Sequence, residues 1–168
     1  MASNLSHARL RAAVTYDPNS GRFFRDYPPS RRRPYAKTRE VGFSTDKGYR
    51  HILVDGRRYI AHRLAWFWMT GNWPPDQVDH IDGNKANNAW VNLRQATNSQ
   101  NQANTKTRRN NRAGLKGAHY LKASGKWTSR VKVNGSRYFL GLFDTPEQAH
   151  AAYAVAAGKY FGKFARAS

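Results

Sequence analysis

Three turn signals constrain the fold of this chain more than any other feature. Asp55-Gly56 and Asn134-Gly135 each separate two runs rich in β-branched and aromatic residues, and such dipeptides favour the tight turns of β-hairpins. A third turn signal, Pro18 to Gly21, separates the segments AAVTY and RFF. Because tight turns join antiparallel strands, the chain is expected to be an α+β protein with small antiparallel sheets.

The segments between the hairpins predict a loop, a short helix and a second mixed region. Residues 26–40, DYPPSRRRPYAKTRE, are rich in proline and contain Arg31-Arg32-Arg33, which favours a surface loop. From Val78 the pattern predicts strand, turn, strand and helix. Apolar residues at helical spacing predict a short helix that ends at Gly71: Leu64, Phe67 and Trp68.

The Asn134-Gly135 turn allows a register to be written for the last hairpin. If Val133 pairs with Ser136, one face of the hairpin is apolar and the other is mainly basic. The expected apolar face comprises Trp127, Ser129, Val131, Val133, Tyr138, Leu140 and Leu142, and the opposite face carries Arg130, Lys132, Arg137 and Phe139.

The segment after this hairpin predicts a helix that covers the apolar face. Thr145-Pro146-Glu147-Gln148 supplies a cap residue, a proline at the first helical position and a glutamine at the third, as a helix start requires. The helix is expected to end near Gly158 or Gly162. Its packing stripe is expected to comprise Ala149, Ala152, Tyr153, Ala156 and Tyr160.

The charge balance indicates a polyanionic partner. The 29 Lys and Arg against 10 Asp and Glu give a net charge of +19, far more than solubility requires. No long basic amphipathic helix is evident, so nucleic acid is favoured over a membrane surface. No segment reaches the roughly 18 to 20 apolar residues of a membrane span, and the first residues lack the apolar core of a signal peptide. A soluble, non-secreted protein is expected.

Three side chains suggest chemistry on a phosphodiester. Its hydrolysis needs an activated water and stabilised charge, which a neutral histidine and a divalent ion can supply. Asp79 and His80 are neighbours on a predicted strand, so their side chains should point to opposite sides. Asn101, on the following predicted helix, offers an amide oxygen. Since the chain has no cysteine, we expect a hard cation and no structural zinc. Taken singly, each residue is as easily a turn or structural residue.

The order of these residues resembles the HNH endonucleases, especially their phage and intron-encoded homing branch. Residues 78–104, VDHIDGNKANNAWVNLRQATNSQNQAN, match in four places: Asp79-His80, Asn87-Asn88, Asn92-Leu93 and Asn101. The preceding AHRLAWFWMTGNWPPDQ extends the resemblance back to residue 61. The resemblance implies a ββα-metal fold with one divalent ion, Mg²⁺ or Mn²⁺. It implies His80 as general base, Asp79 and Asn101 as metal ligands, Asn92 as a brace for the turn that carries His80, and Asp82 and Asn104 as hydrogen-bonding support.

Residues 115–168 resemble the plant ethylene-response-factor (Apetala-type) DNA-binding domain. The resemblance rests on GKW, YFLGLFDT and AAYAVAAGKYFG, and it implies a three-stranded antiparallel sheet in the major groove with one helix behind it. Arg130 and Phe139 depart from the family's residue types, so its sequence preference is not transferred. The positions that match its DNA-facing sites are Lys116, His119, Arg130, Lys132, Arg137 and Phe139.

These patterns predict an HNH nuclease domain with an N-terminal β-rich extension over residues 1–104, a basic linker over 105–114 and a DNA-binding domain over 115–168. The expected function is metal-dependent cleavage of double-stranded DNA, in the bacterial host cytoplasm if the chain is phage-encoded, with no membrane and no obligate protein partner. Two alternatives stay open. One is a sequence-specific DNA-binding regulator with a vestigial nuclease module. The other is a basic packaging or RNA-associated protein, which explains the charge but not the spacing.

Overall fold

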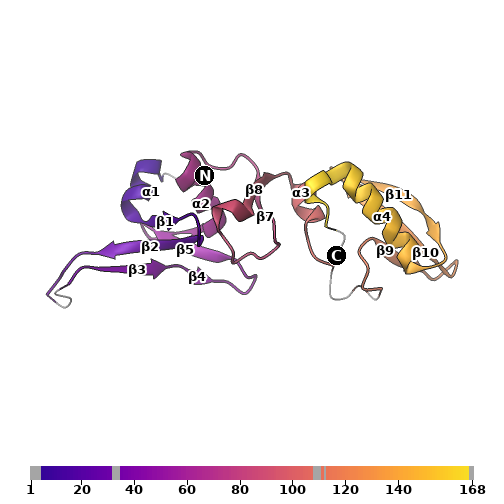
Figure 1. Cartoon of the computed structure of the whole chain (residues 1–168), viewed down its shortest axis with the longest axis horizontal. Helices are drawn as coiled ribbons and strands as arrows, with labels where there is room; N and C mark the ends of the chain where they lie inside the picture. The colour runs from indigo at the N-terminus through magenta and orange to yellow at the C-terminus, as the bar shows by residue number, and fades with distance from the viewer. Residues whose placement is uncertain (1–4, 32–34, 108–110, 112, 167–168) are drawn as a thin grey trace. The chain divides into compact units, whose positions relative to one another are not determined.

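Both units of the chain combine short antiparallel sheets with packed helices (Figure 1), which confirms the mixed α+β class. The computed structural model describes residues 5–31, 35–107, 111 and 113–166. Its contacts divide the chain into Met1–Gln95 and Ala96–Ser168, so the division falls ahead of the domain end expected at residue 104. Parts of the two basic segments lie outside the described residues: Arg32, Arg33, residues 108–110 and Arg112.

The first unit contains three small sheets. Their strand orders are β1-β2-β3, β4-β5-β6 and β7-β8, and every pairing for which a register is known is antiparallel. The elements are α1 (His7–Ala13), β1 (Thr15–Asp17), β2 (Arg22–Tyr27), β3 (Lys37–Val41), β4 (Phe43–Ser44), β5 (Arg50–Val54), β6 (Arg57–Ile60), α2 (Ala61–Thr70), β7 (Gln77–His80), η1 (Trp90–Asn92) and β8 (Leu93–Ala96).

The turn chemistry predicted this part of the fold well. Asp55 and Gly56 have φ of 50° and 74° between β5 and β6, as the expected two-residue turn requires. The hairpin β1–β2 turns before Gly21, and α2 ends at Gly71 in the left-handed conformation. The helix α1 has no counterpart among the sequence predictions. It takes in the start of the AAVTY segment that was expected to be strand.

The expected loop over residues 26–40 is wrong at both ends. Asp26 and Tyr27 continue β2, and residues 37–40 belong to β3, where Tyr27 pairs with Lys37. A hydrophobicity pattern cannot predict this strand, because β3 has no buried residue and therefore no alternation of apolar and polar side chains. Thr38 donates a hydrogen bond to the Asp26 carboxylate across the two strands.

One hydrophobic core holds the first unit together. Side chains from α1, β1, β2, β5, α2 and β7 meet in it, so the strand that carries Asp79 and His80 is anchored to it through Val78. The largest fully buried members are Tyr16, Phe23, Leu10, Ile52 and Leu64.

The second unit is a three-stranded antiparallel sheet with one long helix packed along it. The strand order is β11-β10-β9, and α4 contacts all three strands. Both ends of α4 are as predicted, because Thr145 and Gln148 form a capping box and Gly162 follows the last helical residue. The elements are α3 (Asn98–Ala103), β9 (Ala118–Leu121), β10 (Lys126–Val133), β11 (Ser136–Phe143), α4 (Pro146–Phe161) and η2 (Gly162–Phe164).

The predicted register of the β10–β11 hairpin is right near the turn and wrong beyond it. Leu140 is an extra residue in a β-bulge, so Trp127 opposes Phe143 instead of Leu142. Gly141, next to the bulge, has a φ of 139° that other residues rarely adopt. The pairs next to the turn are as expected: Val133 with Ser136 and Val131 with Tyr138.

The packing stripe of α4 is also shifted from the prediction. Tyr160 is 43% exposed and stacks on Tyr138, while Phe161 is buried in its place, because the helix presents a slightly rotated face to the sheet. The buried residues of α4 are Ala149, Tyr153, Ala156, Ala157 and Phe161.

Candidate active site

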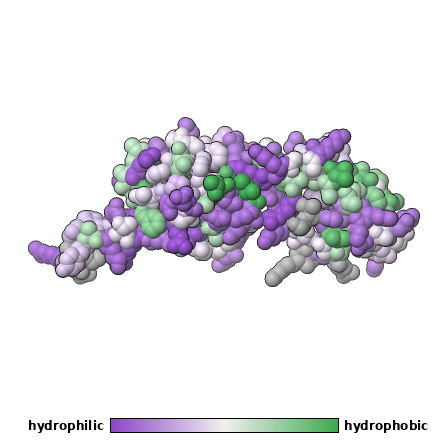
Figure 2. All heavy atoms as spheres, in the orientation of Figure 1, coloured by the Kyte–Doolittle hydropathy of each residue, from purple (hydrophilic) through white to green (hydrophobic). Residues whose placement is uncertain are grey.

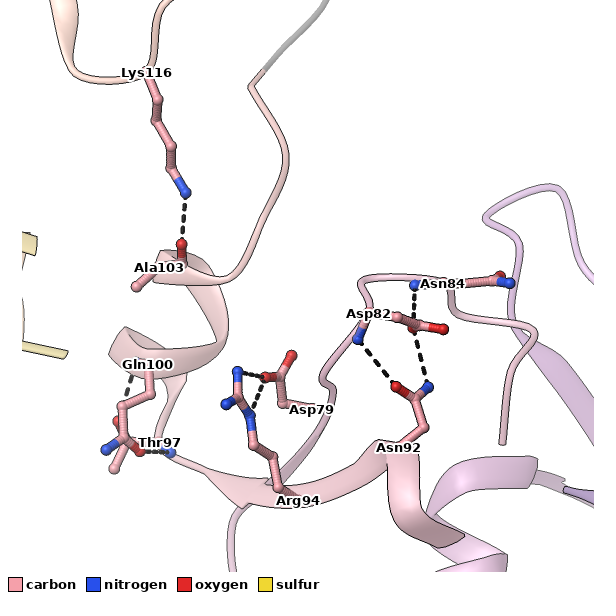
Figure 3. Close-up of polar contacts among 9 residues, drawn as sticks. All are labelled: Asp79, Asp82, Asn84, Asn92, Arg94, Thr97, Gln100, Ala103 and Lys116. Carbon is pink, nitrogen blue, oxygen red and sulfur yellow. Dashed lines mark hydrogen bonds and ion pairs between the residues drawn. The ribbon is translucent and has the colours of Figure 1, made fainter. Parts of the chain in front are cut away.

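The strand β7 presents two functional side chains in opposite directions. Asp79 and His80 are 4% and 5% exposed. The Asp79 carboxylate accepts hydrogen bonds from Arg94 on β8, with Oδ2 lying 2.9 Å from Nε and 2.8 Å from a terminal nitrogen (Figure 3). His80 instead faces Asn88, which lies in the loop that returns to β8. Because successive side chains of a strand point to opposite faces, the carboxylate and the imidazole lie on different sides of β7, as the sequence predicts.

The loop after His80 is organised around Asp82. The Asp82 carboxylate accepts hydrogen bonds from Asn84 N at 2.7 Å and from Asn92 Nδ2 at 3.0 Å (Figure 3). It also accepts one from Asn87 Nδ2 at 2.7 Å. Burial alone would raise the pKa of Asp82, but these hydrogen bonds outweigh it and lower the pKa. Asp82 thus stays ionised and holds the loop.

Asn92 closes the same loop from the other side. Its Oδ1 accepts from Asp82 N at 3.0 Å, and its Nδ2 donates to Asn87 O at 2.8 Å. Its backbone oxygen accepts from Ile81 N at 2.9 Å. All of these contacts fix the chain that follows His80, so Asn92 lies where a brace for that turn belongs.

His80 is held in a largely buried environment that keeps its ring neutral. Burial is the main cause of the lowered pKa, and it outweighs the Asn88 hydrogen bond and the nearby Asp82 and Asp79 carboxylates, which would raise it. A neutral imidazole has one nitrogen with a lone pair and can accept a proton. The ring is therefore in the protonation state that a general base needs at neutral pH.

His62, at the start of α2, is a neighbour of His80 that the sequence predictions missed. The two rings meet edge to face with centroids 4.8 Å apart. His62 is 7% exposed, and its Nδ1 has no hydrogen-bond partner among the described residues. Burial, with the charge of His80 as a smaller cause, lowers the pKa of His62 to about 3. The available signal was a histidine on the apolar face of a predicted helix.

The buried His62 is expected to make folding stability fall in mild acid. The unfolded chain binds a proton near the ordinary histidine pKa of about 6.5, whereas folded His62 has a pKa of about 3. Between those values the unfolded state holds more protons, so the free energy of unfolding decreases as pH falls. From pH 7.5 to 5.5, His62 alone accounts for a loss of about 1.4 kcal/mol. Urea unfolding of native protein and His62→Phe at both pH values measures this. Equal losses in the two proteins would contradict it.

The Asp79 carboxylate is the kind of ligand that a hard cation prefers. Among the described residues, no group of three or more His, Cys, Asp or Glu side chains gathers as a metal site. A site built from one carboxylate and one amide oxygen needs no such group, and these oxygen donors are the ones that Mg²⁺ prefers. Arg94 already engages the Asp79 carboxylate, so a cation bound there would share the carboxylate with the guanidinium.

Asn101, the other predicted ligand, lies on α3 of the second unit. It is half-buried, and its backbone N–H donates to Thr97 O at 2.9 Å within the helix. Thr97 and Gln100 form a capping box that fixes the start of this short helix (Figure 3). Asn104, expected as support, is the buried residue that ends it. The role of Asn101 as a ligand remains a prediction from the sequence.

Comparisons with known proteins identify the chain. A family profile described as HNH endonuclease matches residues 59–103. Protein 3.8 of Escherichia phage T7 is 35% identical over 95 residues, which cover 55% of this chain and 74% of the phage protein. The chain belongs to the HNH endonuclease family. An uncharacterized HNH endonuclease of Acanthamoeba polyphaga mimivirus is 41% identical over 116 residues, covering 68% of this chain but only 59% of the mimivirus protein.

The family match and the mimivirus relative support a DNA-cleaving hydrolase activity for this HNH endonuclease. Residues 59–103 run from β6 through α2, β7 and β8 to the end of α3, so they include Asp79, His80 and Asn101. The sheet β9–β11 lies outside the matched residues. No helix that the structure describes is long and apolar enough to cross a membrane.

The sheet of the second unit carries most of the predicted DNA-binding residues on its surface. Arg130 opposes Phe139, and Lys132 opposes Arg137, so these four side chains are cross-strand neighbours as expected. All four are exposed, and so is His119 on β9. Figure 2 shows one side of the whole chain, on which hydrophilic residues alternate with apolar areas.

Lys116 has a different environment from the other five residues. Its ammonium donates to three backbone oxygens, those of Ala103, Thr105 and Arg166, at 2.5 to 3.0 Å. Burial is the main cause that lowers the pKa of Lys116 to about 8, with the charge of Arg166 as a second cause. All three donor positions of the ammonium are in use. Lys116 is therefore placed to tie α3 to the C-terminal end of this unit, and the predicted contact with DNA would have to break these bonds.

Proposed function

We propose that this HNH endonuclease is a homing-type enzyme that hydrolyses double-stranded DNA with one divalent ion, Mg²⁺ or Mn²⁺, in a ββα-metal site. His80 is the general base, Asp79 and Asn101 hold the ion, and Asn92 braces the loop after His80. The observation that carries the proposal is a buried, neutral His80 next to a buried carboxylate on one strand of the matched region. The phage and mimivirus relatives support an enzyme that acts in the cytoplasm of an infected host cell.

The chain's own part in the reaction is to move a proton. His80 accepts a proton from water as the water oxygen bonds to phosphorus, the bond from phosphorus to the 3′ oxygen breaks, and the leaving oxygen takes a proton from solvent. When bound, the ion would neutralise charge on the phosphate and the leaving oxygen. The rigid Asp82 and Asn92 contacts limit the motion of the loop next to His80, which favours a fixed angle of proton transfer.

The cleavage proposal is tested on supercoiled plasmid with Mg²⁺, with Mn²⁺ and with a chelator. Metal-dependent appearance of nicked or linear DNA supports the proposal. Tight DNA binding without any cutting would favour the alternative of a DNA-binding regulator with a vestigial nuclease module.

The second unit is proposed to position the enzyme on DNA in the manner of the ethylene-response-factor domain. Three observations support this: a three-stranded antiparallel sheet, one helix packed along it, and a set of exposed basic side chains on the sheet. The proposed contacts come from His119, Arg130, Lys132, Arg137 and Phe139. Exposed arginines and lysines on a groove-bound sheet contact phosphates or guanine edges.

Neutralising the basic side chains of the sheet should weaken DNA binding and reduce its dependence on salt. In the triple variant Arg130→Gln, Lys132→Gln, Arg137→Gln, the slope of log affinity against log salt should fall by about 3, because each phosphate contact releases about one counterion. The affinity should fall on the order of 10- to 100-fold. Fluorescence anisotropy on a DNA duplex at several salt concentrations measures both. The matched control changes Lys122, Lys159 and Lys163 to Gln, three exposed lysines of the same unit that lie outside its strands. Equal losses in the two triple variants would contradict a role specific to the sheet.

A further inference from the structure

Asn88 makes a contact with His80 that determines which ring nitrogen carries the proton. Asn88 is 1% exposed, and its Oδ1 lies 3.2 Å from His80 Nε2. Its Nδ2 donates to Ala86 O at 3.1 Å, so the amide is oriented with the oxygen towards His80. An amide oxygen can only accept. His80 Nε2 therefore donates, and in the neutral ring Nδ1 is the nitrogen with the lone pair.

The N-terminal hairpin β1–β2 holds Asn88 in this position. Tyr16 on β1 donates a hydrogen bond from its hydroxyl to Asn88 O at 2.6 Å, and Trp90 N donates to Pro18 O at 2.8 Å. Gly21 lies so close that an added Cβ would be 2.2 Å from the backbone of Asn88 and Ala89. Tyr16 is buried at 2% exposure. The hairpin is thus fixed directly against the segment that carries Asn88, although it lies outside the residues matched by the family.

We propose that Asn88 is a positioning residue that fixes His80 in the tautomer with a basic Nδ1, and that the hairpin β1–β2 is the support that keeps Asn88 in register. The proposal rests on the proposed role of His80 as general base. The side chain of the neighbouring Asn87 instead stabilises the loop, because it donates a hydrogen bond to the Asp82 carboxylate. Loss of a hydrogen-bond partner that fixes the tautomer of a functional histidine commonly lowers activity roughly 10- to 100-fold.

Two substitutions at Asn88 separate hydrogen bonding from packing. Asn88→Leu has a similar size but no acceptor, so kcat should fall roughly 10- to 100-fold with little change in KM for DNA. Asn88→Asp keeps an acceptor oxygen at the same place, so kcat should stay much closer to native than in Asn88→Leu.

The experiment uses the full chain, supercoiled plasmid and Mg²⁺, with thermal unfolding measured for every variant. Asn72→Leu, on an exposed asparagine away from the site, controls for a leucine substitution. Tyr16→Phe removes one support of Asn88 and should lower kcat by less than Asn88→Leu. A native kcat in a folded Asn88→Leu, or a loss of kcat in a folded Asn88→Asp as large as in Asn88→Leu, would overturn the inference. If His80→Ala cuts at the native rate, the proposed function fails instead.

Discussion

Replacing His80 with alanine is expected to lower the rate of DNA cleavage on the order of 10³-fold, because a positioned general base contributes roughly 10² to 10⁴. The ring lies in the matched region, is 5% exposed and has a lowered pKa. DNA affinity should change little, because a neutral ring contributes no charge to phosphate binding. Single-turnover cleavage of a DNA duplex with enzyme in excess measures the rate, and anisotropy measures the affinity.

A second histidine in the same unit provides the control. His51 on β5 is half-buried and contacts the ring of Phe43, so His51→Ala removes an imidazole of the same unit from outside the matched residues. Its cleavage rate should stay within about threefold of native. Equal rate losses in His51→Ala and His80→Ala would mean that general destabilisation, and not loss of the base, explains the effect.

Replacing Asp79 with asparagine is expected to lower cleavage in Mg²⁺ on the order of 10³-fold, since the carboxylate supplies the charge that holds a hard cation. Asn101→Ala should have the smaller effect, because it removes a neutral ligand, and a higher Mg²⁺ concentration should partly restore its rate. The measurement is the cleavage rate as a function of Mg²⁺ concentration for both variants.

Two controls separate metal binding from folding in this experiment. Asn98→Ala changes an exposed asparagine on the same helix as Asn101 and should leave the Mg²⁺ dependence unchanged. Asp79→Asn also leaves Arg94 without its ion-pair partner, so its thermal unfolding must be compared with native protein. A native Mg²⁺ dependence in both Asp79→Asn and Asn101→Ala would exclude them as the ligands.

Local turn and cap chemistry made part of the fold predictable. The turns at Asp55-Gly56 and Asn134-Gly135 and the cap at Thr145 depend on a few adjacent residues, so the sequence reveals them directly. The bulge at Leu140 was not predictable in this way, because it depends on how two whole strands pair. The exposed strand β3 was not predicted for a related reason, because its strand conformation depends on pairing with β2 and not on its own sequence pattern.

The site was predictable where residues act close together in sequence. Asp79, His80 and Asn92 follow one another within a short motif and lie on β7 and η1 of the first unit. His62, Arg94 and Asn88 complete their surroundings through contacts that no spacing rule predicts: a ring contact, an ion pair and one hydrogen bond from a turn asparagine. Lys116 shows the opposite case, because its position matched a DNA-facing site while its ammonium is bound to backbone oxygens.

The most direct test of the central claim is the relaxation of supercoiled plasmid by native protein and by His80→Ala, each with Mg²⁺ and with a chelator. The account predicts nicked or linear product only from native protein with Mg²⁺, and at least about 100-fold less from His80→Ala. Equal cutting by both proteins in Mg²⁺, or cutting by native protein in the chelator, would contradict it.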